Sequence, residues 1–489
     1  MAGIGFELKR LFSKKGLMAQ LRANLYASLV VAGPMLLGAC LLLLVKYLAT
    51  RAGVSLQEQD ALIVMITWAI LFSLLLTSIF SFSLARFISD MLYEEKKERI
   101  LPSMYGAISL CLVIGSIGWG IFLYYADIPL EYAIPVYLLF CESVVVWIQV
   151  SYTNAVKDYK QVLFGFVYAI ASVLVSGYLL IWIFRLPPVT ALLISASIAY
   201  GIMMFHYTLV LHAYFPHGEG SALRFLQWFV KYPALILVGF FSTLGLFGHI
   251  IMMWASPLGR VAIGNFYHAP QHDIPALLAF LSILVTTVNF VTSMEVKFYE
   301  RYRVYFSLLN DGGSLYDIEK AYRDLVTVLK QEMFYLAQVQ LFVTILAIVV
   351  VGELLGVLGL GFTGTMVGLF RILCLGYGVY AIGNVFMLLL LYFADFRDAM
   401  IMSVIFAAAN LGGTYFVIQL PETYYGFGFV AAAFCLYILG WLLLSRFIRN
   451  LDYHIYCKQP VFVRDKVGFF QRFIDRIDQK ILERTTEES

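Results

Sequence analysis

Glu142 and Gln149 are polar residues inside a long apolar segment of the chain, residues 131–153. They lie seven positions apart, so a helix over this segment places both side chains on one face. An ionisable side chain in apolar surroundings is costly and usually faces a cavity or a partner. Glu142 is therefore a candidate for lining a path or for acting as a protonation switch. The alternative is a carboxylic acid that is simply protonated and buried.

Two other apolar segments carry hydroxyl and amide side chains spaced by three or four residues. This spacing places each set on one face of a helix. Such a stripe either lines a path or holds membrane helices together through hydrogen bonds. The stripes consist of Ser73, Thr77 and Ser81 in the first segment and of Ser282, Thr286, Asn289 and Ser293 in the second.

A fourth apolar segment reads CLGYGVYAIGNVF over residues 374–386. Tyr377, Tyr380 and Asn384 share one helix face there. Tyrosine suits sugar rings, because its aromatic face is an apolar platform with a polar tip. Arg371 lies near the start of the same helix, points away from the tyrosine face and cannot lose its charge. It is a further functional candidate, unless its side chain snorkels to lipid headgroups.

The elements that position these residues are predicted to be membrane helices. Of the 489 residues, 61% are hydrophobic and only 13% are charged. The mean hydropathy is +0.84. A soluble domain has about 25% charged residues, so the sequence indicates an all-α integral membrane protein. A helix needs about 20 apolar residues to cross the hydrocarbon core of a bilayer. Twelve such segments occur: 25–46, 62–83, 104–125, 131–153, 161–183, 191–212, 231–253, 274–296, 335–353, 366–392, 398–420 and 424–446.

The distribution of basic residues predicts the orientation of these helices. With a cytoplasmic N-terminus, nearly all of the 34 Lys and Arg residues fall in cytoplasmic segments. Such an asymmetry is typical of a correct topology. Twelve spans then return the C-terminus to the cytoplasm. The net charge of +3 follows from this rule and does not indicate binding of nucleic acid.

The spans are predicted to form two halves of six helices, as in transporters whose path lies between related halves. At the N-terminus, basic residues alternate with apolar ones at helical spacing, which favours an interfacial helix over a cleaved signal. The predicted order is an interfacial helix (1–24), a first six-helix half (25–212), a cytoplasmic connector (213–230), a second six-helix half (231–446) with cytoplasmic helices over 297–334, and a cytoplasmic tail with an amphipathic helix (447–489).

Three cytoplasmic stretches, 83–99, 297–334 and the tail, carry an apolar stripe at helical spacing. In the second stretch, NDGG (310–313) is expected to end one helix and Ser314 to cap the next. Each stripe lies on lipid, braces the bundle or docks a protein partner. The candidate docking residues are Ile318 and Tyr322 in the second stretch and Phe470, Phe473 and Ile477 in the tail.

Motifs of pumps and enzymes are absent from the sequence. It has no GxxxxGK[ST] loop for ATP and no HExxH zinc motif. The nearest approach to a DxD metal–sugar-nucleotide signature, ADFRD (394–398), has the wrong spacing. The seven His are scattered along the chain, and the six Cys form no CxxC pattern. The sequence therefore predicts no enzyme, metal site or cofactor.

The stretch MAGIGFELKRL at the N-terminus, followed by GPMLLG in the first span, resembles the PelG family of Pel exopolysaccharide transporters. The two six-span halves are similar to the multidrug/oligosaccharidyl-lipid/polysaccharide (MOP) flippase superfamily, to which MATE transporters belong. The resemblance implies a protein of the bacterial inner membrane that passes a growing, N-acetylhexosamine-rich polymer outward. It also implies a UDP-sugar-using cytoplasmic glycosyltransferase of family 4 as a partner, with the membrane scaffold and cyclic-di-GMP receptor subunits of a Pel-type synthase.

The leading hypothesis is a polysaccharide conduit between the two halves, lined by the two stripes, Glu142 and the face of Tyr377 and Asn384. A polymer longer than the membrane keeps its path occupied, so polymerisation at the inner mouth is expected to drive movement in place of alternating access. One alternative is an ion-coupled exporter or a flippase for lipid-linked oligosaccharides. Another is a membrane scaffold that organises a polysaccharide synthase.

Overall fold

A computed structural model of the chain describes residues 36–156, 159–216, 218, 221–357 and 362–451. This part contains 11 helices that are long and apolar enough to cross a membrane. Each matches one of the predicted spans from 62–83 onward, so these predictions are confirmed. Of the first predicted span, residues 25–35 lie outside the described residues, and residues 36–51 are helical.

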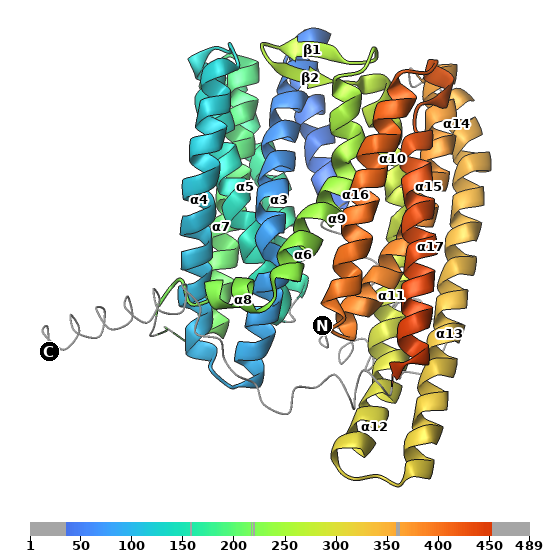
Figure 1. Cartoon of the computed structure of the whole chain (residues 1–489). Helices are drawn as coiled ribbons and strands as arrows, with labels where there is room; N and C mark the ends of the chain where they lie inside the picture. The colour runs from blue at the N-terminus through green and yellow to red at the C-terminus, as the bar shows by residue number, and fades with distance from the viewer. Residues whose placement is uncertain (1–35, 157–158, 217, 219–220, 358–361, 452–489) are drawn as a thin grey trace, which may run out of the picture. The chain divides into compact units, whose positions relative to one another are not determined.

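The described residues form two compact units. We call residues 36–244 with 260–268 the N-terminal unit, and residues 245–259 with 269–451 the C-terminal unit. Helix α9 (Pro233–Trp254) contributes to both. Besides the helical residues 36–51, the other helices of the N-terminal unit are α3 (Leu56–Tyr93), α4 (Ile100–Tyr125), α5 (Leu130–Val156), α6 (Tyr159–Tyr178), α7 (Pro188–Tyr214) and α8 (Leu226–Lys231). A 3₁₀ turn lies at Lys97–Arg99 and a π turn at Leu179–Ile183 (Figure 1).

The C-terminal unit is likewise helical. Its helices are α10 (Pro270–Phe280), α11 (Leu284–Thr292), α12 (Tyr299–Asn310), α13 (Leu315–Leu346), α14 (Gly352–Val357), α15 (Gly364–Tyr392), α16 (Phe396–Ile418) and α17 (Phe427–Arg449). Short 3₁₀ turns occupy Leu281–Ile283 and Glu422–Tyr424, and π turns occupy Ser293–Phe298 and Ala347–Val351.

Helix α3 is 38 residues long, much longer than the predicted span. It starts with a capping box, in which Ser55 Oγ accepts a hydrogen bond from the Glu58 N–H and the Glu58 carboxylate accepts one from the Ser55 N–H. The prediction of a separate surface helix over 83–99 is wrong for residues 83–93, because these residues are the last part of α3, which ends at Tyr93. No Gly or Pro stands in SLARFISDMLY to end the helix earlier.

The break predicted at NDGG is confirmed, because α12 ends at Asn310 and Ser314 caps α13 by accepting a hydrogen bond from the Asp317 N–H. Helix α13 then runs without interruption to Leu346, so the predicted boundary between a surface helix and a span at 334 does not exist. The hairpin of α12 and α13 extends beyond the ends of α11, α15 and α17 in the same unit (Figure 1).

The predicted span over 274–296 is not one regular helix. It consists of α10, a 3₁₀ turn, α11 and the start of a π turn. Hydroxyl side chains bond back to the helix here, from Ser282 Oγ to the Ala279 carbonyl at 2.7 Å and from Thr287 Oγ1 to the Ile283 carbonyl at 3.1 Å. Such back-bonding weakens and bends helices, which accounts for the irregular geometry.

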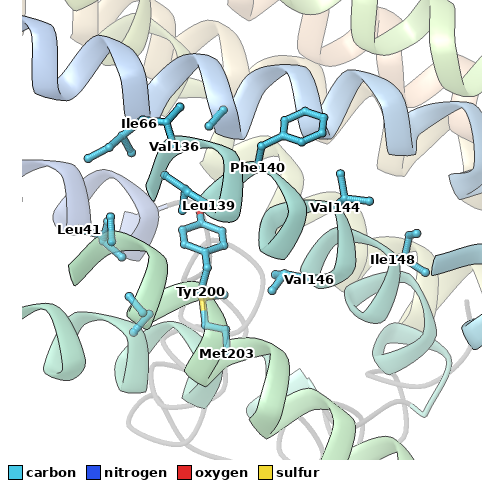
Figure 2. Packing of buried hydrophobic residues seen from close by; sticks show 14 of the residues in the cluster. Leu41, Ile66, Val136, Leu139, Phe140, Val144, Val146, Ile148, Tyr200 and Met203 are labelled. Carbon is cyan, nitrogen blue, oxygen red and sulfur yellow. The ribbon is translucent and has the colours of Figure 1, made fainter. Parts of the chain in front are cut away.

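The core of the N-terminal unit is built around α5. Val136, Leu139, Val144 and Val146 of this helix are completely buried. Figure 2 shows these side chains together with Tyr200 and other core residues of the neighbouring helices. An apolar helix buried on several sides fixes the polar residues that it carries, here Glu142 and Gln149, against its neighbours.

A β-hairpin between α9 and α10 belongs to the N-terminal unit, although its sequence lies in the second half of the chain. Strand β1 (Arg260–Ile263) pairs antiparallel with β2 (Phe266–His268). Gly264, at φ +50°, approaches α4 so closely that a Cβ there would meet the Ala126 carbonyl oxygen. Trp68 donates a hydrogen bond to the Tyr267 carbonyl at 2.9 Å, and the Phe266 ring lies 5.2 Å from the Trp68 ring. The predictions contain no hairpin, although RVAIGNFYH has the alternation and the Gly-Asn turn of one.

Candidate functional site

Glu142 is half-buried on α5, and it faces α7. Its Oε2 accepts a hydrogen bond from Ser197 Oγ at 2.6 Å. Gly201, one turn further along α7, leaves room for the other oxygen, because a Cβ at this position would lie 3.2 Å from Oε1. Among the described residues, no basic side chain forms an ion pair with Glu142. The site therefore holds an acidic group with one neutral donor.

Gln149 also faces α7, as its seven-residue spacing from Glu142 predicts. Its Nε2 donates to Thr208 Oγ1 at 2.8 Å, and the side chain is 1% exposed. Its Oε1 is buried without a hydrogen-bond partner. An unsatisfied acceptor at this depth is costly, so Gln149 has unused capacity for a donor from a ligand or a water molecule.

The stripe on α3 divides into two parts. Ser73 and Thr77 are buried inside the N-terminal unit. Trp147 of α5 donates its indole N–H to Ser73 Oγ at 3.1 Å, and Thr77 Oγ1 donates to the Ser73 carbonyl at 2.9 Å. Ser81 is only half-buried and bonds to the Ser78 carbonyl. The stripe is therefore not one open face, and Ser73 fits the alternative of a contact between helices.

The second stripe also divides, because part of it meets a polar face of α13. Ser293 Oγ donates to Glu332 Oε2 at 2.7 Å, and Thr286 Oγ1 donates to Gln340 Oε1. Gln340 Nε2 in turn donates to Thr344 Oγ1 at 3.1 Å. We call these five residues the polar seam. All five are buried, since the polar groups of each helix satisfy those of the other.

Two residues of this stripe remain outside the polar seam. Ser282 and Asn289 are half-buried, and each bonds to a carbonyl of its own helix. Lys297 adds a charge to the end of the seam, because its Nζ lies 2.7 Å from Glu332 Oε1. The predicted boundary at 334 places Glu332 in a surface helix and Gln340 in a span. Their position on one face of the single helix α13 is therefore not predicted.

We expect the polar seam to stabilise the C-terminal unit measurably. In a double-mutant cycle of Thr286→Val and Gln340→Leu, the coupling free energy should be about 1 kcal/mol, because each single variant leaves a buried polar group unpaired. Unfolding in detergent–lipid micelles measures it. Thr287→Val, at the neighbouring exposed hydroxyl, should show no coupling to Gln340→Leu. Additive effects of the first pair would show that the seam does not contribute to stability.

The tyrosine face of α15 is buried inside the C-terminal unit. Tyr377 is 1% exposed, with its hydroxyl 3.3 Å from Nε2 of His249 and its ring 4.7 Å from that of Phe429. Tyr380 stacks on Phe406 at 5.4 Å. Asn384 is half-buried. The expectation that these tyrosines offer a platform for sugar rings is therefore not met in this structure, because other aromatic rings already cover them.

Arg371 forms an ion pair that is not predicted from the sequence. Its Nη2 donates to the Glu353 carboxylate of α14, within the C-terminal unit. Both side chains are partly exposed. An ion pair reduces the cost of an arginine at this depth. The pairing shows how Arg371 is accommodated and does not place it on a path.

The candidate docking residues of α13 lie near the start of this helix, which adjoins the tip of the α12–α13 hairpin. Tyr322 donates a hydrogen bond from its hydroxyl to the Ile448 carbonyl at 2.9 Å, so it braces the end of α17. Ile318 is half-buried. The candidates in the tail, Phe470, Phe473 and Ile477, lie outside the described residues.

Two of the histidines, which are scattered along the sequence, come together in one cluster of side chains. His249 of α9 and His272 of α10 are both buried, with ring centroids 5.3 Å apart. Asp273 and Tyr377 complete the cluster. No local spacing reveals it, because its members come from three helices. Within the described residues, no three His, Cys, Asp or Glu side chains are placed to hold a metal ion.

Comparisons with known proteins show the family and the fold of the chain. Residues 1–456 match the family model described as "PelG: Putative exopolysaccharide Exporter (EPS-E)". A search of curated proteins gives no match. Among solved structures, an outward-facing MATE family multidrug resistance transporter of the MOP superfamily superposes with a TM-score of 0.59 at 12% identity, over 87% of this chain and 96% of that chain.

Two further structures share this fold. A MOP superfamily transporter from Pyrococcus furiosus, described with a binding pocket of reverse polarity, gives a TM-score of 0.56 at 12% identity and covers 87% of this chain and 96% of its own. The Vibrio cholerae MATE transporter VcmN, in a mutant form, gives a TM-score of 0.57 at 13% identity and covers 88% and 98%. The protein is thus a multi-pass membrane transporter with a MATE-like fold, not an enzyme, and the chain belongs to the PelG family of exopolysaccharide exporters.

Proposed function

We propose that the exported polymer is Pel, an N-acetylhexosamine-rich polysaccharide, and that it crosses the bacterial cytoplasmic membrane outward while it grows. The observation that carries this proposal is the family match, which extends over residues 1–456. The distribution of Lys and Arg supports cytoplasmic termini, with the connector 213–230 and the tail 447–489 on the same side. Residues 1–24 would then lie on the anionic inner leaflet.

The residues proposed to contact the polymer are polar side chains that are only half-buried: Ser81 and Glu142 in the N-terminal unit, and Ser282, Asn289 and Asn384 in the C-terminal unit. Hydroxyl and amide groups form hydrogen bonds of modest strength with sugar hydroxyls. Many weak contacts hold a polymer without fixing it, so that it slides as new sugars are added. Polymerisation at the inner mouth then supplies the driving force.

The α12–α13 hairpin is the proposed docking surface for the cytoplasmic glycosyltransferase of family 4 and for the scaffold and cyclic-di-GMP receptor subunits. At its tip, Leu315 and Tyr316 are 74% and 68% exposed. Ile318 lies one turn further along α13. Phe470, Phe473 and Ile477 of the tail, which lie outside the described residues, are proposed as further docking residues. Exposed apolar residues at the end of a projecting hairpin suit a protein partner.

The experiment uses inverted membrane vesicles that contain this chain and its glycosyltransferase partner, supplied with labelled UDP-N-acetylhexosamine. Polymer protected in the lumen reports transport, and total polymer reports synthesis. With the double substitution Asn289→Leu/Asn384→Leu, protection should fall about fivefold while synthesis continues, because two polar contacts with the polymer are lost.

Thr287→Leu is the matched control, since Thr287 is an exposed hydroxyl on the same helix as Asn289. It should leave protection unchanged. If the double substitution has no effect while removal of residues 461–484 abolishes synthesis, the chain is a scaffold and another protein forms the path. If no polymer is protected even with the wild-type chain, the conduit proposal is wrong.

One observation favours a second candidate function, an ion-coupled exporter or a flippase for lipid-linked oligosaccharides. The carboxyl group of Glu142 has a neutral donor, Ser197, and forms no ion pair with a basic side chain in the described part of the chain, which suits a group that binds and releases a proton. Transport that depends on the proton gradient and needs no glycosyltransferase would support this alternative.

A further inference from the structure

The strongest unused feature of the molecule is the pair of buried histidines in the C-terminal unit. His249 and His272 are 1% and 0% exposed, and their rings lie edge to face. Nε2 of His272 is buried and has no hydrogen-bond partner. Nδ1 of His249 is buried and also has no hydrogen-bond partner. Buried polar atoms are normally paired, so these two nitrogens require an explanation.

A carboxylate stands beside this pair. Asp273 Oδ2 accepts hydrogen bonds from the Trp254 indole N–H at 3.0 Å and from the Ala269 N–H at 2.9 Å. Its Oδ1 lies 3.5 Å from Nδ1 of His272. In the described part of the chain, no Lys or Arg forms an ion pair with Asp273. Among the residues that the structure describes, the imidazole of His272 is the group beside Asp273 that could become its cation.

The other helices around the pair contribute aromatic residues. From α15, the Tyr377 hydroxyl lies 3.3 Å from Nε2 of His249, and Tyr380 is the next titratable group on that helix. From α17, the Phe429 ring stacks on His249 at 4.3 Å. The titratable groups that face the histidines are therefore one carboxylate and tyrosine hydroxyls, and none of these is a permanent cation.

We propose that His249 and His272 together hold one proton, with Asp273 as the counter-charge. A proton on His272 places a positive charge in a buried ring beside the carboxylate of Asp273, whose side chain is 26% exposed, so that the two groups together carry no net charge. Two protons would place like charges on rings 5.3 Å apart, so the pair holds only one. In the structure the two rings are not hydrogen-bonded to each other, and Nε2 of His249 lies 3.3 Å from the Tyr377 hydroxyl.

The position of the site indicates what the proton controls. Asp273 binds Trp254 and Ala269, which are the residues at the two ends of the segment 255–268. This segment carries the β-hairpin. When His272 is protonated both of its ring nitrogens carry a proton, so Nδ1 is then always a donor toward Oδ1 of Asp273. Protonation of the site therefore changes the strength of the hydrogen bonds by which Asp273 joins the two ends of the segment.

The test is a count of protonated imidazoles in the full chain, labelled with ¹⁵N-histidine and embedded in lipid nanodiscs. Imidazole ¹⁵N shifts distinguish charged from neutral rings. At pH 7 the wild-type protein should show the signal of one charged imidazole, and this signal should be absent from the His272→Gln variant. It should also disappear on Asp273→Asn, which keeps His272 and nearly the same shape but removes the counter-charge. His249→Gln should leave the charged signal of His272 in place, because Asp273 remains beside it.

His206→Gln is the matched control. His206 also lies in a membrane helix, but it bonds to the Gln161 carbonyl and not to an acid. This variant should keep the charged signal, and unchanged signals of the remaining His show that each variant is folded. The proposal is overturned if His249 and His272 are both neutral from pH 8 to pH 5, or if Asp273→Asn leaves the charged signal in place. Neither result depends on which polymer is exported.

Discussion

The substitution Gly428→Ala should destabilise the C-terminal unit by about 3 kcal/mol, the upper end of the usual cost of overpacking. Gly428 lies in the first turn of α17, where this helix crosses α16. A Cβ at this position would lie 2.5 Å from the Thr414 N and 2.6 Å from the Gly413 carbonyl carbon. Both are main-chain atoms, so no side chain can rotate away and the helices must separate. Loss of monodisperse protein on heating in detergent measures the effect.

Gly412→Ala is the matched control for this prediction. Gly412 lies on α16, next to Gly413, but a Cβ there would meet nothing within 4 Å. Alanine is a better helix former than glycine, so this variant should be neutral or more stable by up to about 1 kcal/mol. If the two variants lose stability equally, the close crossing of α16 and α17 is not what stabilises this part of the unit.

The substitution Glu142→Leu should lower luminal protection of polymer about 20-fold, while synthesis continues. It removes the acceptor of Ser197 Oγ and any polar contact that the carboxyl group makes with the transported chain, and hydrogen bonds to charged groups contribute about 2 kcal/mol. Glu142→Gln keeps a polar side chain of the same size. For a conduit that binds sugar hydroxyls, the glutamine variant should retain most of the transport.

The comparison of these two variants separates the proposed functions. If Glu142→Gln is as inactive as Glu142→Leu, the proton is needed and the ion-coupled alternative is favoured. Ser197→Ala tests the partner, because it removes the donor but keeps the carboxyl group. It should reduce transport less than Glu142→Leu does. Equal, full activity of all three variants would exclude Glu142 from the transport path.

Much of the fold could be predicted from the sequence because spans depend on composition and length. The long apolar runs and the NDGG break are local signals, and the structure has helices and a break at those positions. The continuity of α13 was missed because charged residues such as Lys330 end the apolar run, whereas backbone geometry continues through them. A change in polarity along a helix marks the edge of the membrane and not the end of the helix.

The candidate site was less predictable, because a polar stripe shows which residues share a face but not what that face meets. Ser73 and Thr286 looked alike in sequence to Ser81 and Asn289. The first two are buried against Trp147 and Gln340, which lie 74 and 54 residues away. Contacts of this kind depend on the packing of helices, and one sequence carries no direct signal of it.

The β-hairpin has a consequence for how the chain matures. All helices of the N-terminal unit have been synthesised once residue 244 leaves the ribosome, but Phe266 follows only after the rest of α9. Until then the rings of Trp68 and Phe122, which lie 5.2 Å from Phe266 in the final structure, have no hairpin to cover them. The N-terminal unit is therefore complete only after residues 260–268, which belong to the second half of the chain, have been synthesised. Two fragments divided at the connector would leave the first half without its own hairpin, whereas a division after His268 would supply it.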